Sequence, residues 1–149
     1  MLRVAVTPAG GAPRVPGLDA AAMVAIVERA ARATLEARGI GEAEVSLALL
    51  DEAAMAALNG RWKGREAPTD VLAFALHENG DPPLGDVYLG WEQAVRQAAD
   101  VGEPVARELA RLAIHGTLHV LGFDHAEEDR ESSEMWAHQE SILEALDIR

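Results

Sequence analysis

The sequence contains no cysteine. This absence excludes disulfides, thiolate zinc sites, iron–sulfur clusters and cysteine nucleophiles. It also suits a reducing compartment, in which disulfides are rare. Any metal site in this chain must therefore be built from histidine or carboxylate ligands.

Positive charge is also scarce, because 13 Lys and Arg stand against 25 Asp and Glu and the formal net charge is −12. Broad, nonspecific wrapping of nucleic acid needs a basic surface, so the charge argues against this class of function. A local basic groove is still compatible with the composition.

Long hydrophobic runs are missing as well. The longest run, at residues 20–27, stops at Glu28. It is far shorter than the roughly 20 residues that span a bilayer, and residues 1–15 lack the apolar stretch of a signal peptide. We expect a soluble, cytoplasmic protein without a membrane partner.

The 149 residues, 49% of them hydrophobic and 26% charged, are typical of one globular domain covering residues 1–149. Alternating or continuous apolar runs predict strands at residues 2–6, 45–50, 71–76 and 86–89. Capping residues and helical patterns predict helices at residues 19–38, 51–60, 91–101, 104–121 and 132–146, with a polar loop or edge at 61–68. The fold class is therefore α+β, a four-stranded mixed sheet flanked by helices.

Three histidines are arranged as metal ligands would be. His115 and His119 are four residues apart, so they share one face of the predicted helix. Gly122 can adopt a positive φ, end the helix and turn the chain back, which lets His125 reach the same point. Three nitrogen ligands that leave a position free for water are typical of a catalytic zinc site at the helix C-terminus. The competing interpretation is that these three histidines are unrelated and bind no metal. The two remaining histidines, His77 and His138, are interpreted as structural or solvent-facing residues.

The same spacing occurs in metzincin proteases, H-E-x-x-H-x-x-G-x-x-H. Their glutamate, the general base, is replaced here by Gly116. A peptidase would need another base, for which Asp124 is a candidate. Alternatively, Asp124 could orient an imidazole, cap the following segment or have no chemical role.

Three blocks occur in one order along the chain: L-N at Leu58 followed by P-T-D-V-L-A-F ending at Phe74, L-G-D-V ending at Val87, and H-G-x-L-H-x-x-G-F-D-H ending at His125. Together they resemble the bacterial YbeY family of metal-dependent endoribonucleases, which act in ribosomal RNA maturation. The resemblance implies a mixed sheet flanked by helices and one Zn²⁺ bound by His115, His119 and His125. It also implies a ribosomal RNA precursor as substrate and the small ribosomal subunit or its proteins as partners, with no DNA substrate expected.

The segment before Pro68 departs from the family pattern. Lys63 stands where the family usually has a functionally important arginine. Lysine keeps the positive charge but loses the planar, two-pronged grip of arginine on phosphate. Arg61 and Arg65 flank it and could supply that grip, so we take Lys63 as a candidate catalytic residue and its two neighbours as candidate substrate-binding residues. The alternative is a solvated surface loop.

Arg107 and Arg111 lie four apart on the helix that carries the histidines. They could line the same cleft, or they could pair with Glu103 and Glu108.

The leading hypothesis is a zinc-dependent endoribonuclease that prefers single-stranded ribosomal RNA. A zinc peptidase and a non-catalytic, zinc-containing ribosome assembly factor are the alternatives.

Overall fold

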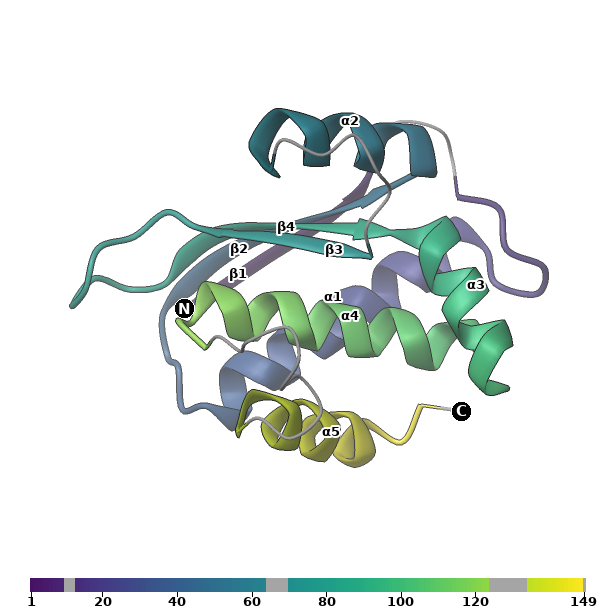
Figure 1. Ribbon diagram of the computed structural model, residues 1–149. Coiled ribbons are helices and arrows are strands. Elements are labelled where there is room, and N and C mark those ends of the chain that lie inside the picture. The colour runs from purple at the N-terminus through teal and green to yellow at the C-terminus, as the bar shows by residue number, and fades with distance from the viewer. Residues whose placement is uncertain (10–12, 64–69, 124–133, 149) are drawn as a thin grey trace.

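The computed structural model describes residues 1–9, 13–63, 70–123 and 134–148. Its elements form a sheet with helices on both faces (Figure 1). They are β1 (Leu2–Pro8), α1 (Ala20–Ala37), β2 (Ala43–Leu50), α2 (Glu52–Lys63), β3 (Val71–Ala75), β4 (Leu84–Gly90), α3 (Trp91–Val101), α4 (Val105–Val120) and α5 (Glu134–Leu146). The predicted α+β class and the four strands are confirmed.

The four strands are ordered β1-β2-β4-β3. β1, β2 and β4 are parallel, whereas β3 pairs antiparallel with β4 and forms one edge. The parallel pair β1 and β2 is joined through α1, as a parallel connection requires a crossover. The β3–β4 connection contains Gly80 at φ 95°, a turn conformation that glycine adopts without steric cost.

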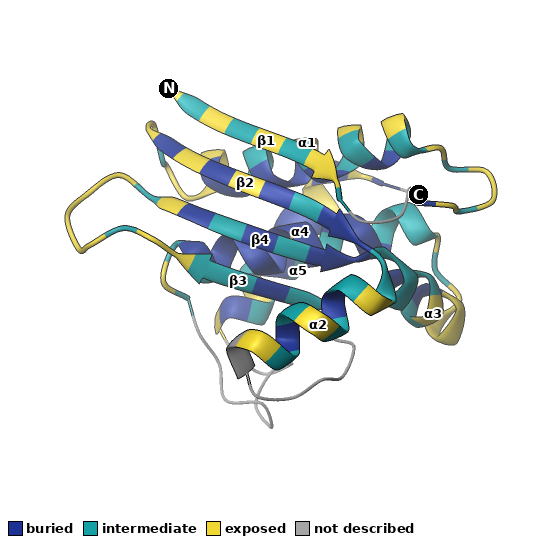
Figure 2. Ribbon diagram, turned by 90° about the horizontal axis from the view of Figure 1, so that it is seen from above, coloured by how far each residue is buried: buried dark blue, intermediate teal, exposed yellow. Residues whose placement is uncertain are grey.

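Side chains of β2 alternate between the two faces of the sheet. Val45, Leu47 and Leu49 are buried in the main core, whereas the alternating residues Glu44 and Ser46 are exposed. Figure 2 shows this alternation and shows α2 lying over the opposite face. The main core therefore lies between the sheet and the layer formed by α1 and α4, with α5 packed beneath (Figure 1).

Helix α4 occupies the centre of this arrangement. It packs against α1, α3, α5, β3 and β4, so it is buried around most of its circumference. Any polar group on α4 must therefore find a partner within the protein. This environment determines what the two histidines of α4 contact.

The prediction for residues 61–68 is partly wrong, because residues 61–63 continue α2. The helix was predicted to end at residue 60, where Gly60 costs about 1 kcal/mol in a helix interior. Packing outweighs this cost: Met55 and Leu58 of α2 contact Leu50 and Leu72 of the sheet in a second, smaller core. Residues 64–69, including Arg65, lie outside the described residues.

A smaller correction concerns the start of α4. Pro104 was expected in the first turn, but it is the N-cap residue, one position before the helix. It still lacks the N–H that would be unpaired at this helix end. None of the helices in the described ranges is both long and apolar enough to span a bilayer.

Candidate metal centre

The C-terminal end of α4 is a glycine-dependent turn. Gly122 has φ 100°, and its N–H donates to the carbonyl of His119 at 3.0 Å. The N–H of Phe123 donates to the carbonyl of Leu118 at 3.0 Å. This pair of bonds is a Schellman motif, which stops a helix and redirects the chain. The predicted role of Gly122 in ending the helix is confirmed.

His115 and His119 converge one turn before that end. Their Nε2 atoms are 3.1 Å apart, and their rings are edge-to-face with centroids 4.7 Å apart. Two ring nitrogens that each lie about 2.0–2.1 Å from a tetrahedral zinc ion are separated by about 3.3–3.4 Å. The two residues present therefore fit one imidazole-ligated ion in both chemistry and spacing.

The third predicted ligand, His125, lies outside the described residues, as does Asp124. Within the residues that the structure does describe, no group of three or more histidine and carboxylate side chains forms a metal site. The structure thus brings together two members of the predicted triad.

His115 has a partner that the sequence did not reveal. His115 is only 4% exposed, and its Nδ1 is 2.6 Å from Oε1 of Gln139 in α5. Gln139 is fully buried among apolar residues such as Met135 and Leu143. The sequence feature that could have revealed this contact is a glutamine on the apolar face of an amphipathic helix, because a buried polar group needs a hydrogen-bond partner.

Of the two interpretations of Arg111, the one in which it pairs with Glu103 and Glu108 is confirmed. Its Nη1 donates to Glu103 at 2.8 Å and to Glu108 at 2.9 Å, and its Nε donates to Glu140 at 3.0 Å. Arg107 likewise pairs with Glu103 and Glu144. Three carboxylates therefore take up the donors of Arg111.

The carboxylates around Arg111 differ in their electrostatics. The hydrogen bond from Arg111 lowers the pKa of Glu103 below its ordinary value. Burial raises the pKa of Glu108, which is only 5% exposed, and the bond to Arg111 opposes that shift. The carboxylates in turn raise the pKa of Arg111, so the guanidinium remains charged.

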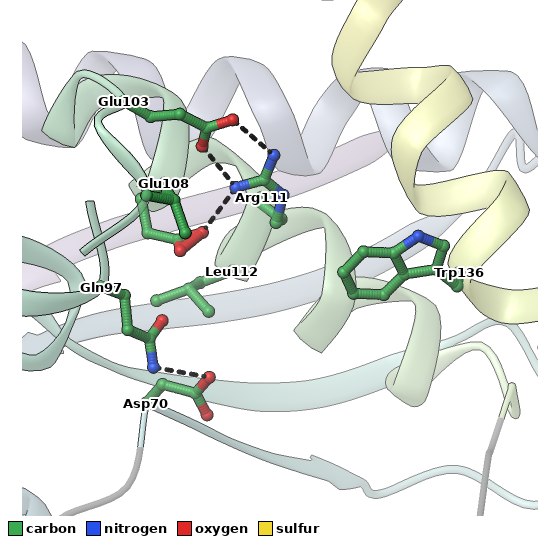
Figure 3. Close-up of a pocket in the computed structure, with 8 residues that line it drawn as sticks. Asp70, Gln97, Glu103, Glu108, Arg111, Leu112 and Trp136 are labelled. Carbon is green, nitrogen blue, oxygen red and sulfur yellow. Dashed lines mark hydrogen bonds and ion pairs between the residues drawn. The ribbon is translucent and has the colours of Figure 1, made fainter. Parts of the chain in front are cut away.

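A cavity of about 370 Å³ lies beside this cluster, one to two turns before His115 on α4. Figure 3 shows Glu103 and Glu108 on Arg111, the Asp70–Gln97 pair on the neighbouring wall, and Trp136 of α5 on the remaining side. With three carboxylates and one guanidinium, the lining is acidic. This polarity disfavours entry of an RNA phosphate.

The described part of the basic segment formed by Arg61, Lys63 and Arg65 does not lie beside the histidine pair. Arg61 is exposed on α2, and α2 covers the face of the sheet opposite α4 (Figure 1). The backbone of Lys63 ends α2, while its side chain lies outside what is described. The roles predicted for Arg61, Lys63 and Arg65 stay predictions.

The remaining histidines have structural contacts, as predicted. His77 Nδ1 lies 3.1 Å from both the N and the O of Leu84 and so bridges the two strands of the hairpin. His138 packs edge-to-face on Phe123 at a centroid distance of 5.3 Å.

Gly116 decides against the peptidase alternative. A Cβ built on Gly116 would lie 2.5 Å from Cγ1 of Val87 and 3.2 Å from Cγ2 of Val71. The position therefore faces the sheet, not the histidine pair, and has no room for a side chain. A metzincin glutamate could not stand here as a general base.

Fold and site together define an α+β protein with a candidate metal centre of two imidazoles at the end of a buried helix. A family model described as Endoribonuclease YbeY matches residues 16–147. The chain therefore belongs to the Endoribonuclease YbeY family, which confirms the resemblance of the three sequence blocks.

Curated relatives and a solved structure agree with this assignment. Endoribonuclease YbeY of Moorella thermoacetica is 44% identical over 139 residues, covering 85% of this chain and 88% of the relative. Endoribonuclease YbeY of Pelotomaculum thermopropionicum is 43% identical over 136 residues, with 85% and 88% covered. The solution structure of a Thermotoga maritima protein superimposes with a TM-score of 0.65 and 27% identity, covering 95% of this chain and 87% of that one.

Proposed function

We propose that this chain is a zinc-dependent endoribonuclease that cleaves single-stranded regions of a ribosomal RNA precursor. Membership of the Endoribonuclease YbeY family gives the reaction class, hydrolysis of RNA. The observation that carries the zinc dependence is the 3.1 Å approach of the His115 and His119 Nε2 atoms. His125 would be the third ligand.

A zinc ion bound by these imidazoles would supply Lewis-acid chemistry for the cleavage of a phosphodiester. The chain's own residues do the remaining work. His115 and His119 would hold the ion, and His119 is only half-buried. Lys63, with Arg61 and Arg65, would supply the local positive charge that attracts an RNA strand to an otherwise acidic protein.

The proposal extends to the small ribosomal subunit as partner and the cytoplasm as location. The ribosomal partner is what the resemblance of the three sequence blocks implies, and a cysteine-free chain is compatible with a reducing compartment. DNA is not expected as a substrate, because proteins distinguish RNA by its 2′-hydroxyl.

The test is cleavage of an end-labelled, single-stranded ribosomal RNA fragment by zinc-loaded wild type and by His119→Ala. His77→Ala is the matched control, since it removes a histidine whose described contacts are with the β3–β4 hairpin. We expect cleavage by wild type and by His77→Ala, and at least a hundredfold loss in folded His119→Ala. Equal cleavage by all three proteins would identify a contaminating nuclease and contradict the proposal.

Absence of cleavage by wild type would favour the assembly factor, in which zinc serves structure. That alternative predicts that His119→Ala lowers the melting temperature and ribosome binding together, with no turnover to lose. Cleavage of casein instead of RNA would revive the peptidase, against the packing at Gly116.

A further inference from the structure

Gln139 connects the histidine pair to the Arg111 cluster through hydrogen bonds. Its Oε1 lies 2.6 Å from Nδ1 of His115, and its Nε2 donates to Oε2 of Glu140 at 2.9 Å. Gln139 is fully buried, so each end of its amide needs a partner. The described structure gives each end one.

Glu140 fixes which end of the amide faces His115. A carboxylate can only accept hydrogen bonds, so the amide nitrogen of Gln139 must face Glu140 and the amide oxygen must face His115. Glu140 is itself held by Arg111, whose Nε and Nη2 donate to its two oxygens at 3.0 and 3.3 Å. The Gln139 side chain therefore cannot reverse without placing an oxygen against a carboxylate.

The orientation of the amide determines the tautomer of His115. An amide oxygen only accepts, so the 2.6 Å contact requires the proton on Nδ1. The neutral ring then carries its lone pair on Nε2, the atom that faces His119.

We propose that Gln139 is a positioning residue for the metal centre: it holds His115 in the tautomer and ring orientation that present Nε2 to zinc, and the Arg111–Glu140 pair holds Gln139. The inference rests on the proposed function, because it concerns the zinc ligand named there. Hydrogen-bond partners of metal-bound histidines act in this way, and their loss typically lowers metal affinity 10- to 100-fold.

The chain offers variants that separate positioning from general stability. Gln139→Met keeps the length and the helix-forming character of the side chain but removes its strong acceptor. Gln139→Glu keeps an acceptor for Nδ1, but it loses the donor to Glu140 and places a second carboxylate against that residue. Gln97→Met is the matched control, because Gln97 makes a similar bond, to Asp70 at 3.3 Å, on α3.

Two measurements are made on protein labelled with ¹⁵N in histidine. The first is zinc affinity by competition with a chromophoric chelator. The second is the ¹⁵N spectrum of the imidazoles in the zinc-free protein, which distinguishes an Nδ1-protonated from an Nε2-protonated ring. Circular dichroism establishes that each variant is folded.

We expect His115 to be Nδ1-protonated in wild type and Gln97→Met. Gln139→Met should lose 10- to 100-fold in zinc affinity and show a mixture of His115 tautomers, whereas Gln139→Glu, which still accepts from Nδ1, should recover the Nδ1-protonated tautomer. A folded Gln139→Met with wild-type affinity would overturn the inference. An Nε2-protonated His115 in wild type would overturn it without any variant, even if Gln139→Met does not fold.

These outcomes are distinguishable from failure of the proposed function. If wild type binds zinc with the expected tautomer but cleaves no RNA, the nuclease proposal fails and the role of Gln139 stands. If wild type binds no zinc, both the zinc dependence and this inference fail.

Discussion

The backbone of Gly116 in α4 packs directly on the side chain of Val87 in β4. A Cβ at position 116 would lie 2.5 Å from Val87 Cγ1, closer than carbon atoms approach in proteins. Val87 is fully buried and pairs with strands on both sides, so it has no space to retreat. This contact sets how near α4, and with it His115, lies to the sheet.

Gly116→Ala should therefore destabilise the protein by about 1–3 kcal/mol, the usual cost of overpacking a core. Glycine to alanine in a helix interior otherwise stabilises by about 1 kcal/mol, so the sign of the change reports the steric contact. Urea denaturation is the measurement. Gly41→Ala is the control, since a Cβ there meets nothing within 4 Å. Unchanged or increased stability of Gly116→Ala would contradict the packing.

Removal of the charge of Glu103 and removal of the charge of Glu108 should affect protein stability in opposite directions, although both carboxylates bond to Nη1 of Arg111. The pKa of Glu103 is lowered in the fold, so its ionised form stabilises the protein above the unfolded pKa of about 4.3 and this stability is lost as pH falls through the folded value. The pKa of Glu108 is raised by burial, so its ionised form opposes folding above that raised value, and the cost disappears at lower pH.

Glu103→Gln should thus cost about 1–2 kcal/mol at pH 7, with the difference from wild type shrinking below about pH 4. Glu108→Gln should be neutral or stabilising at pH 7, because the amide oxygen still accepts from Arg111. Urea denaturation at pH 7 and pH 4 compares the two. A larger loss for Glu108→Gln than for Glu103→Gln at pH 7 would refute this ordering.

Removal of zinc should lower the thermal stability of the wild-type protein. Zinc at 100 times its dissociation constant stabilises the folded state by about 2.7 kcal/mol, which for a domain of this size corresponds to about 5–10 °C in melting temperature. Differential scanning calorimetry with and without chelator measures the shift. His77→Ala should retain the shift and His119→Ala should lack it. The same shift in both variants would place the metal elsewhere.

Lys63 should contact RNA phosphate if the basic segment binds substrate. It is the sole lysine of the chain, so reductive cross-linking to periodate-oxidised RNA can involve only this side chain or the N-terminal amine. Lys63→Ala should weaken RNA binding several-fold and reduce the slope of log affinity against log salt by about 0.7. Lys63→Arg should restore binding. Arg3→Ala is the control for charge, since Arg3 is exposed on β1 at the other edge of the sheet; an equal effect there would argue against a specific contact.

The local features of the fold were predictable because neighbouring residues encode them. Asp19 caps α1, where its side chain accepts from the N–H of Ala22 at 2.8 Å, and Gly122 ends α4 with a positive φ. Prediction failed where local preference and tertiary packing favour different structures. Gly60 indicated a helix end, but α2 stays helical because Met55 and Leu58 pack on the sheet.

By itself, the sequence determined that His115 and His119 share one helix face, because a period of 3.6 residues brings side chains four apart together. It also determined the class of ligand, since no cysteine is available. Only the tertiary structure decided that Gln139 meets His115, that Arg111 serves carboxylates, and that Gly116 faces the sheet. The physical reason is that these contacts join elements that are distant along the chain. Each depends on how α4 is packed between the sheet and α5, and local sequence does not encode that packing.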